Sequence, residues 1–298
     1  MPETARGTSI GVALSLGASA LFGLIFLVSG WVHAPAEVVL AWRVVITFGC
    51  YALLLLGQSG RRALSEYLSV VRSIRGGPLL VITLALMVSS QLWVFVWAPA
   101  HGMALDASLG FLLLPITLAL GGRFIFHEPI SRVQWVAIAV ACLAVALKVL
   151  LVAEFSWVTA LICFGYPVYF MTRRHTGLGH RAGFGVEMAL LTPVMVLLLL
   201  TTPAGSPALA TIAGVGIIAF SGAAAMAAYL GASTRLSLPV FGLLSYVEPL
   251  LLVAVSLLLG ESLTASDYWI YGLLAVSLGI LGMDAMRAVW HSRGLRNT

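Results

Sequence analysis

The sequence has very little charge. Of its 298 residues only 9% are Asp, Glu, Lys or Arg, whereas 61% are hydrophobic, and the mean hydropathy is +1.06. Soluble domains carry about 25% charged residues, so a chain of this composition cannot cover a water-facing surface. The composition therefore predicts an integral membrane protein.

Cysteine is also scarce, and two common catalytic motifs are missing from the sequence. The three cysteines, Cys50, Cys142 and Cys163, lie inside apolar runs and form no Cys-x-x-Cys pair, which argues against a disulfide framework or a zinc knuckle. There is no Walker loop, and Ser131 stands where a zinc-protease motif beginning at His127 would need its second histidine. We therefore expect no catalytic residue, no metal and no cofactor. An intramembrane enzyme is the weakest alternative.

Lysine is almost absent, and the arginines are unevenly distributed. The chain has one lysine and fifteen arginines. If the N-terminus is cytoplasmic, fourteen arginines fall on the inner side, only Lys148 lies near the outer face, and Arg43 lies within a span. The positive-inside rule then predicts a multi-pass protein of the cell membrane with both termini in the cytoplasm. Because the arginines are spread over separate loops, they do not indicate a nucleic-acid partner.

Long apolar runs fill the rest of the chain. Most are near 20 residues, the length a helix needs to cross a hydrocarbon core of about 30 Å, and none alternates as a membrane strand would. We therefore expect an all-α membrane protein in a lipid bilayer, with loops that are short except at Gln58–Gly77 and Thr172–Gly183. The ten predicted spans are 8–30, 37–57, 78–100, 106–126, 131–151, 155–172, 184–202, 208–230, 238–260 and 267–288.

Two stretches of the chain resemble each other. Pro115 and Pro249 each lie in the middle of an apolar run, and Trp135 and Trp269 each lie near the start of the next one. Both pairs have the same offset, 134 residues. An equal offset between unrelated residue types indicates a duplicated unit, as in broken-helix transporters.

The predicted topology makes the two copies inverted. The fifth and sixth spans meet on the outer side, so each half has five spans, and an odd number of spans reverses the second half. The sequence predicts ten transmembrane helices arranged as two inverted five-helix repeats. We place the halves at 1–152 and 153–298, within one integral membrane domain.

Two charged residues lie deep within predicted spans, where a charge costs at least ~2.5–3.5 kcal/mol unless it faces a cavity or a partner. Arg43 is expected to line the central cavity, with snorkelling toward the surface as the alternative. Glu248 is the deepest acid and directly precedes Pro249, which frees a backbone carbonyl near Ser245. Glu248 is either a proton-coupling carboxylate or half of a structural pair, for which Arg43 is a candidate partner.

The third span supplies aromatic residues. Gln91 and Phe95 are four residues apart and share one helical face, whereas Trp93 and Trp97 share another. The tryptophans fit an interfacial belt. Gln91 lies deeper and is a candidate for hydrogen bonding to a substrate.

Several short motifs occur in order along nearly the whole chain. They are Ala-Glu at 36–37, Arg43 after an aromatic residue, WVFVWA at 93–98, ASLGFLLLP at 107–115 with a helix ending in a glutamate, Tyr246 with a proline three residues later, and Met-Asp-Ala at 283–285. Together they resemble the RarD-type branch of the drug/metabolite transporter superfamily, the EamA-like permeases. The resemblance implies ten helices, two inverted repeats and a central substrate cavity.

The sequence departs from that pattern where polar groups are usual. Phe111 stands in place of Tyr, Leu114 in place of Asn, Gln91 in place of Asn, and glycine is replaced by His127 and by Glu248. Substrate choice therefore cannot be copied from a relative. The expected substrate-binding residues are Arg43, Gln91, Phe95, Ser108, Phe111, Ser245, Tyr246 and Glu248.

The sequence as a whole predicts a secondary transporter. We expect it to move small metabolites or amphipathic drugs by alternating access through a central cavity, driven by an ion gradient, by exchange or by the substrate's own gradient. A passive channel or facilitator is the main alternative. The substrate, the direction of transport and the oligomeric state are left open.

Overall fold

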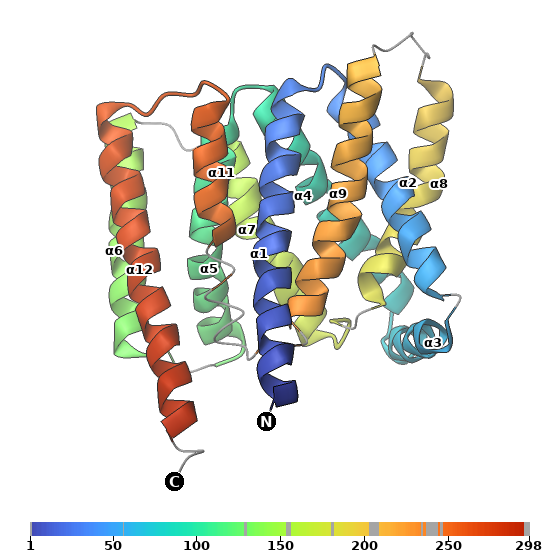
Figure 1. Cartoon of the computed structure of the whole chain (residues 1–298), viewed down its shortest axis with the longest axis horizontal. Coiled ribbons are helices and arrows are strands. Elements are labelled where there is room, and N and C mark those ends of the chain that lie inside the picture. Colours follow the sequence, from blue (N-terminus) through green and yellow to red (C-terminus); the bar gives the residue numbers. More distant parts are fainter. Residues whose placement is uncertain are drawn as a thin grey trace.

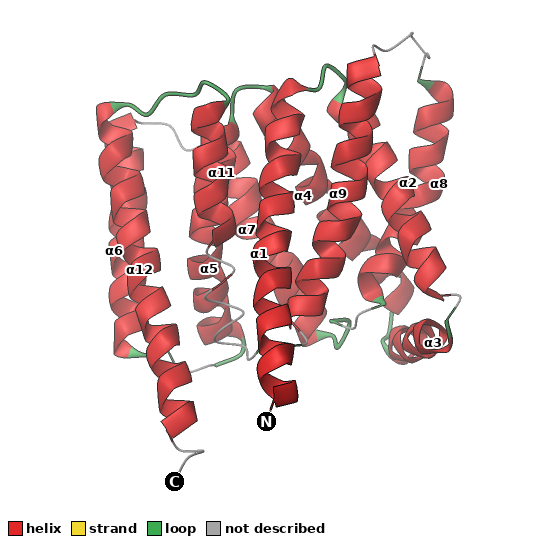
Figure 2. Cartoon of the chain, viewed as in Figure 1, coloured by secondary structure: helices red, strands yellow, loops and turns green. Residues whose placement is uncertain are grey.

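A computed structural model describes residues 2–55, 57–127, 130–152, 156–179, 182–202, 209–233, 235–236, 244 and 247–294. Nearly all of these residues are helical, and no strand occurs among them (Figure 2). The prediction of an all-α chain is confirmed. The helices are α1 (Pro2–Trp31), α2 (Ala36–Leu55), α3 (Gln58–Ser73), α4 (Gly77–Ala100), α5 (Ala104–Ile125), α6 (Arg132–Val152), α7 (Trp157–His175), α8 (Gly183–Thr201), α9 (Leu209–Ser233), α11 (Val247–Leu258) and α12 (Ala265–Gly294).

Six of these helices, α1, α2, α4, α5, α8 and α9, are long and apolar enough to cross a membrane. Many large apolar side chains point outward from the bundle: Leu200 is 79% exposed, and Leu79 is 69% exposed. In a soluble protein such residues would be buried, but in a bilayer they face acyl chains that are as apolar as they are. The exposed leucines therefore agree with a membrane-embedded bundle.

The predicted spans match the described helices to within a few residues at most ends, except at both outer ends of the chain. The N-terminal part of the ninth predicted span lies outside the described residues. The clearest error is the segment Gln58–Gly77, which we expected to be a loop. Most of it forms α3, a 16-residue helix with Tyr67 and Val71 on its buried face. In Figure 1 this helix is seen nearly end-on and runs across the neighbouring helices.

The helices pack in pairs formed by residues far apart in the sequence. Helix α6 lies beside α12, α1 beside α9, and α2 beside α8 (Figure 1). Helices α5 and α7 approach closely at Gly110, where an added Cβ would lie 2.8 Å from the Cβ of Ile162. Small residues permit this kind of backbone approach inside a membrane.

The N-terminal end of α1 and the C-terminal end of α12 lie on the same side of the bundle (Figure 1). Helix α3 lies on that side as well, because it connects the end of α2 to the start of α4. The arrangement defines one face of the bundle that carries both termini and α3.

Candidate functional site

Arg43 lies about two turns into α2 and is buried in the bundle, with 4% of its surface exposed. Its Cζ lies 5.7 Å from the centre of the Phe95 ring, within the range of a cation–π contact. Its Nη1 has no hydrogen-bond partner. Gly222 of α9 lies close on another side, where an added Cβ would be 2.8 Å from the Arg43 Nε.

A row of aromatic rings extends from this arginine across three helices. Phe95 of α4 meets Phe111 of α5 edge-to-face, with the ring centres 5.5 Å apart. Phe111 in turn lies 5.7 Å from Tyr166 of α7. On the other side, Phe95 packs against Phe26 of α1 at 5.2 Å. The charged group of Arg43 therefore lies at one end of a buried row of aromatic rings.

Tyr166 of α7 lies near the other polar groups of the site. Its side chain lies within electrostatic range of Arg43 of α2, Tyr229 of α9 and Glu248 of α11. Sequence reasoning missed both tyrosines. The available signal for Tyr166 was its position next to Pro167, inside the span that follows the midpoint of the chain.

Glu248 is partly buried near the start of α11. It makes no ion pair with Arg43, although both side chains are described. Both groups lie within electrostatic range of the Tyr166 side chain. In this conformation, the arrangement does not support the hypothesis that Glu248 forms a direct structural pair with Arg43.

Gln91 is 1% exposed and ties two helices together. Its Nε2 donates a hydrogen bond of 3.0 Å to the Leu161 carbonyl of α7, and its Oε1 has no hydrogen-bond partner. Gly165 of α7 is pressed against the Gln91 amide. Gln91 therefore positions α4 against α7 and keeps one oxygen available as an acceptor.

Ser108 lies in the contact between α5 and α11. Its hydroxyl donates to the Ala104 carbonyl at 2.8 Å and lies 2.9 Å from the Ser256 hydroxyl of α11. Two other predicted site residues, Ser245 and Tyr246, lie outside the described residues. Arg43, Phe95 and Phe111 are the predicted residues in direct ring or cation–π contact.

The tryptophans of α4 form a separate cluster near its C-terminal end. Trp93 stacks on Trp97 with ring centres 5.4 Å apart, and Trp157 of α7 lies 5.1 Å from Trp97. The Trp93 indole N–H donates to Glu37 at 3.1 Å. Trp93 and Trp97 are partly buried and also pack against the apolar cluster that includes Phe95.

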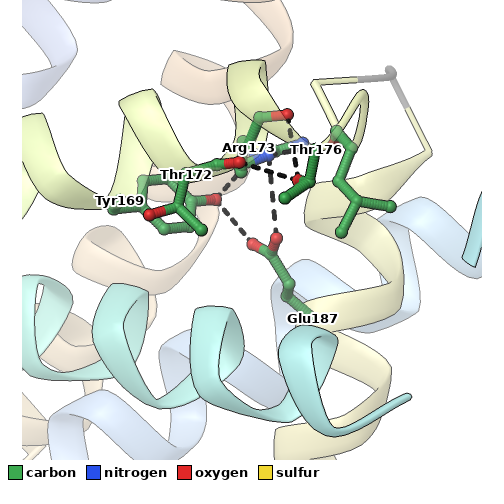
Figure 3. Close-up of polar contacts among 6 residues, drawn as sticks. Tyr169, Thr172, Arg173, Thr176 and Glu187 are labelled. Carbon is green, nitrogen blue, oxygen red and sulfur yellow. Dashed lines mark hydrogen bonds and ion pairs between the residues drawn. The ribbon is translucent and has the colours of Figure 1, made fainter. Parts of the chain in front are cut away.

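A second polar cluster is buried between α7 and α8 (Figure 3). The Tyr169 hydroxyl donates to Glu187 Oε2 at 2.6 Å and accepts from Arg173 Nη1 at 2.6 Å. Arg173 Nε lies 3.8 Å from Glu187 Oε1, and Glu187 is fully buried. The pairing offsets the cost of burying both charges.

Tyr67 of α3 packs against this cluster. An added Cβ at Gly183 would meet both Arg173 Nη2 at 2.5 Å and Tyr67 Cε2 at 3.0 Å, so the two side chains flank the same glycine. Burial raises the pKa of the Tyr67 phenol to about 12; nearby Glu187 adds to the rise and Arg173 opposes it. Tyr67 is therefore uncharged at neutral pH.

Within the described ranges, no group of three or more His, Cys, Asp or Glu side chains is arranged to hold a metal ion. The site described above instead offers one buried cation, aromatic rings and a nearby carboxylate.

Known proteins similar to this chain decide its family. An uncharacterized transporter of Pasteurella multocida is 36% identical over 280 residues, which cover 90% of this chain and 94% of the relative. The chloramphenicol-sensitive protein RarD of Pseudomonas aeruginosa is 35% identical over 208 residues, covering 68% of this chain and 70% of that protein. The chain belongs to the RarD-type transporter family. Protein RarD of Salmonella typhi is 25% identical to this RarD-type chain over 95% of its length and 97% of the relative.

Two further comparisons bear on the RarD-type chain. No protein-family model matches it. A solved crystal structure superimposes with a TM-score of 0.52 at 20% sequence identity, covering 94% of this chain and 99% of the other. At that identity the similarity supports a shared fold alone.

Proposed function

We propose that this RarD-type membrane transporter is a secondary transporter that moves small metabolites or amphipathic drugs by alternating access. The substrate would bind where Arg43, Phe95, Phe111, Tyr166 and Glu248 meet. A passive facilitator is the second candidate, and an intramembrane enzyme is the least favoured.

The observation that carries this proposal is the buried Arg43 guanidinium, whose Nη1 has no hydrogen-bond partner. A charge held at membrane depth is costly, and residues that bear that cost commonly mark a substrate or ion pathway. The planar fork of an arginine suits a carboxylate or a carbonyl oxygen of a substrate. The adjacent Phe95 and Phe111 rings would receive its apolar part.

Two inverted five-helix halves, 1–152 and 153–298, fit the pairing of the helices. We match α1, α2, α4, α5 and α6 with α7, α8, α9, α11 and α12. Under this matching, each contact between two helices should recur between their two matched helices. The α1–α9 contact recurs as α7–α4, the α5–α7 contact recurs as α11–α1, and the α2–α9 contact recurs as α8–α4. The pairs α2–α8, α5–α11 and α6–α12 are their own counterparts. An approximate two-fold axis in the membrane plane would give this pattern, and rocking of one half against the other would expose the site to each side in turn.

The arginine distribution supports a cell-membrane protein whose termini and α3 face the cytoplasm. The test is labelling of single cysteines placed at Ser59 and at His101 in a cysteine-free background. Both residues are exposed. Ser59 lies in α3, which precedes α4, and His101 directly follows the C-terminal end of α4. Labelling of both from one side would overturn this topology.

The transport proposal is tested by replacing Arg43 in purified protein reconstituted into liposomes. Candidate substrates are first found by thermal shift, because a ligand of the folded state raises its apparent stability. We expect Arg43→Ala to abolish uptake while folded protein is still recovered, and Arg43→Lys to restore it only in part. Counterflow of one substrate against another would separate a carrier from a channel, and an altered product would indicate an enzyme.

A further inference from the structure

We propose that the arginine-bearing face of α3 binds the anionic headgroups of phospholipids in the adjoining leaflet. Along α3, Arg61 and Arg72 are eleven residues apart, close to three full helical turns, and therefore lie on one side. Arg62 lies next to them, and all three side chains are exposed. Arg75 follows the helix directly and is exposed as well.

The rotation of α3 about its axis is fixed by its other face. Tyr67 is 0% exposed and Val71 is 7% exposed, and both pack into the cluster that includes Leu178 and Phe184. Tyr67 also abuts Arg173, as the contacts at Gly183 show. Because these side chains are held inside, Arg62, which lies half a turn round the helix from Val71, must face away from the bundle. Arg61 and Arg72 lie roughly 80–140° round the helix from the buried residues, on its exposed flank.

The position of α3 places that face at the edge of the bilayer. The helix connects α2 to α4 and runs across their ends (Figure 1). Leu53 of α2 is 68% exposed, and Leu79 of α4 is 69% exposed. These leucines would meet acyl chains, so the adjoining α3 would lie at the depth of the headgroups, as amphipathic interfacial helices do.

Charge complementarity indicates which phospholipids the arginine-bearing face of α3 binds. Four arginines, Arg61, Arg62, Arg72 and Arg75, stand against a single acid, Glu66, in this segment. Basic clusters directly beside a membrane span are attracted to anionic lipids. A zwitterionic headgroup offers no net charge to this face, so the proposal commits to phospholipids such as phosphatidylglycerol.

The test compares lipid retention by two matched variants of the full chain. Arg62→Gln/Arg72→Gln removes two charges from α3, whereas Arg123→Gln/Arg132→Gln removes two exposed charges from the same side of the bundle but from α5 and α6. Each purified protein is mixed with phosphatidylglycerol and phosphatidylcholine of identical acyl chains, and retained lipid is counted by native mass spectrometry. Thermal unfolding in detergent confirms that both variants are folded.

We expect wild-type protein to retain phosphatidylglycerol preferentially. At low salt, the preference should fall about fivefold for each arginine removed from α3. The control variant should keep the wild-type preference. Equal retention of the two lipids by wild-type protein, or an equal loss in the control, would overturn the proposal. Displacement of the lipid by millimolar inorganic phosphate would also overturn it, since the site would then bind a free anion. The readout involves no transport and stands whether or not the proposed transport cycle is correct.

Discussion

The Glu261 carboxylate accepts a hydrogen bond of 2.6 Å from the backbone N–H of Ala104, the first residue of α5. Its other oxygen accepts from the Leu105 N–H at 2.7 Å. Tyr271 donates to the Leu105 carbonyl at 2.7 Å. A carboxylate from one half of the chain thus caps a helix in the other half, where free N–H groups and the helix dipole favour negative charge.

We expect Glu261→Ala to destabilise the protein by about 1–3 kcal/mol, because two N–H groups at the start of α5 lose their acceptor. Glu261→Gln should cost less, since one amide oxygen remains to accept. Thermal unfolding in detergent measures both. Glu37→Gln is the matched control: Glu37 is exposed, and a glutamine oxygen can still accept from Trp93. Unchanged stability in Glu261→Ala would show that the cap contributes nothing.

Removal of the Tyr169 hydroxyl should be more damaging than removal of the Tyr67 hydroxyl. Tyr169→Phe leaves Glu187 Oε2 and Arg173 Nη1 without their shared partner, which we expect to cost about 1–3 kcal/mol. The Tyr67 hydroxyl is buried and has no hydrogen-bond partner, so Tyr67→Phe should be nearly neutral. Denaturation of the two purified variants side by side checks this, and equal losses would contradict it.

Two glycines of α9 allow a matched test of the space around Arg43. An added Cβ at Gly222 would lie 2.8 Å from Arg43 Nε, whereas nothing lies within 4 Å of one at Gly216. Gly222→Ala should therefore displace the guanidinium and reduce substrate binding, measured as a smaller ligand-induced thermal shift. Gly216→Ala should leave binding unchanged and raise stability slightly, because alanine favours helix. Equal substrate binding by the two variants would show that Arg43 is not part of the substrate site.

Glu248→Gln distinguishes proton coupling from a structural role. If Glu248 carries the coupling proton, the variant should lose uptake driven by a pH gradient but keep exchange of substrate for substrate. If Glu248 is structural, both activities, or the folded protein itself, should be lost. Proteoliposomes with an imposed pH gradient provide the measurement. Gradient-driven uptake equal to wild type would exclude Glu248 as the coupling group.

Much of the fold was predictable because membrane helices are specified by length and hydropathy alone. The errors occurred where that signal is weak. Gln58–Gly77 has four arginines and was interpreted as a loop, although Ala63, Tyr67 and Val71 recur at four-residue spacing, as one face of a helix requires. A search for spans does not detect a helix of this kind, because its apolar face is narrow.

The candidate site was only partly predictable, for a physical reason. Arg43 stood out because a charge in an apolar run is conspicuous, and Phe95 and Phe111 were inferred from the motifs around them. Tyr166 was not predicted, because the sequence does not show which neighbouring helix an aromatic residue of a membrane helix faces. The Ser108 hydroxyl joins α5 to α11, and the direction of a side chain depends on packing that the sequence does not display.

The contact between Arg43 and Phe95 has a consequence for how cargo would be released. The guanidinium already interacts with a ring, so an incoming acidic group that draws Arg43 toward itself must weaken that existing contact. Binding would then exchange one interaction for another instead of adding a new one. Only the difference between the two interaction energies contributes to the binding affinity, so the cargo is bound with moderate affinity. A carrier benefits from this, since a cargo held too tightly would never leave on the far side.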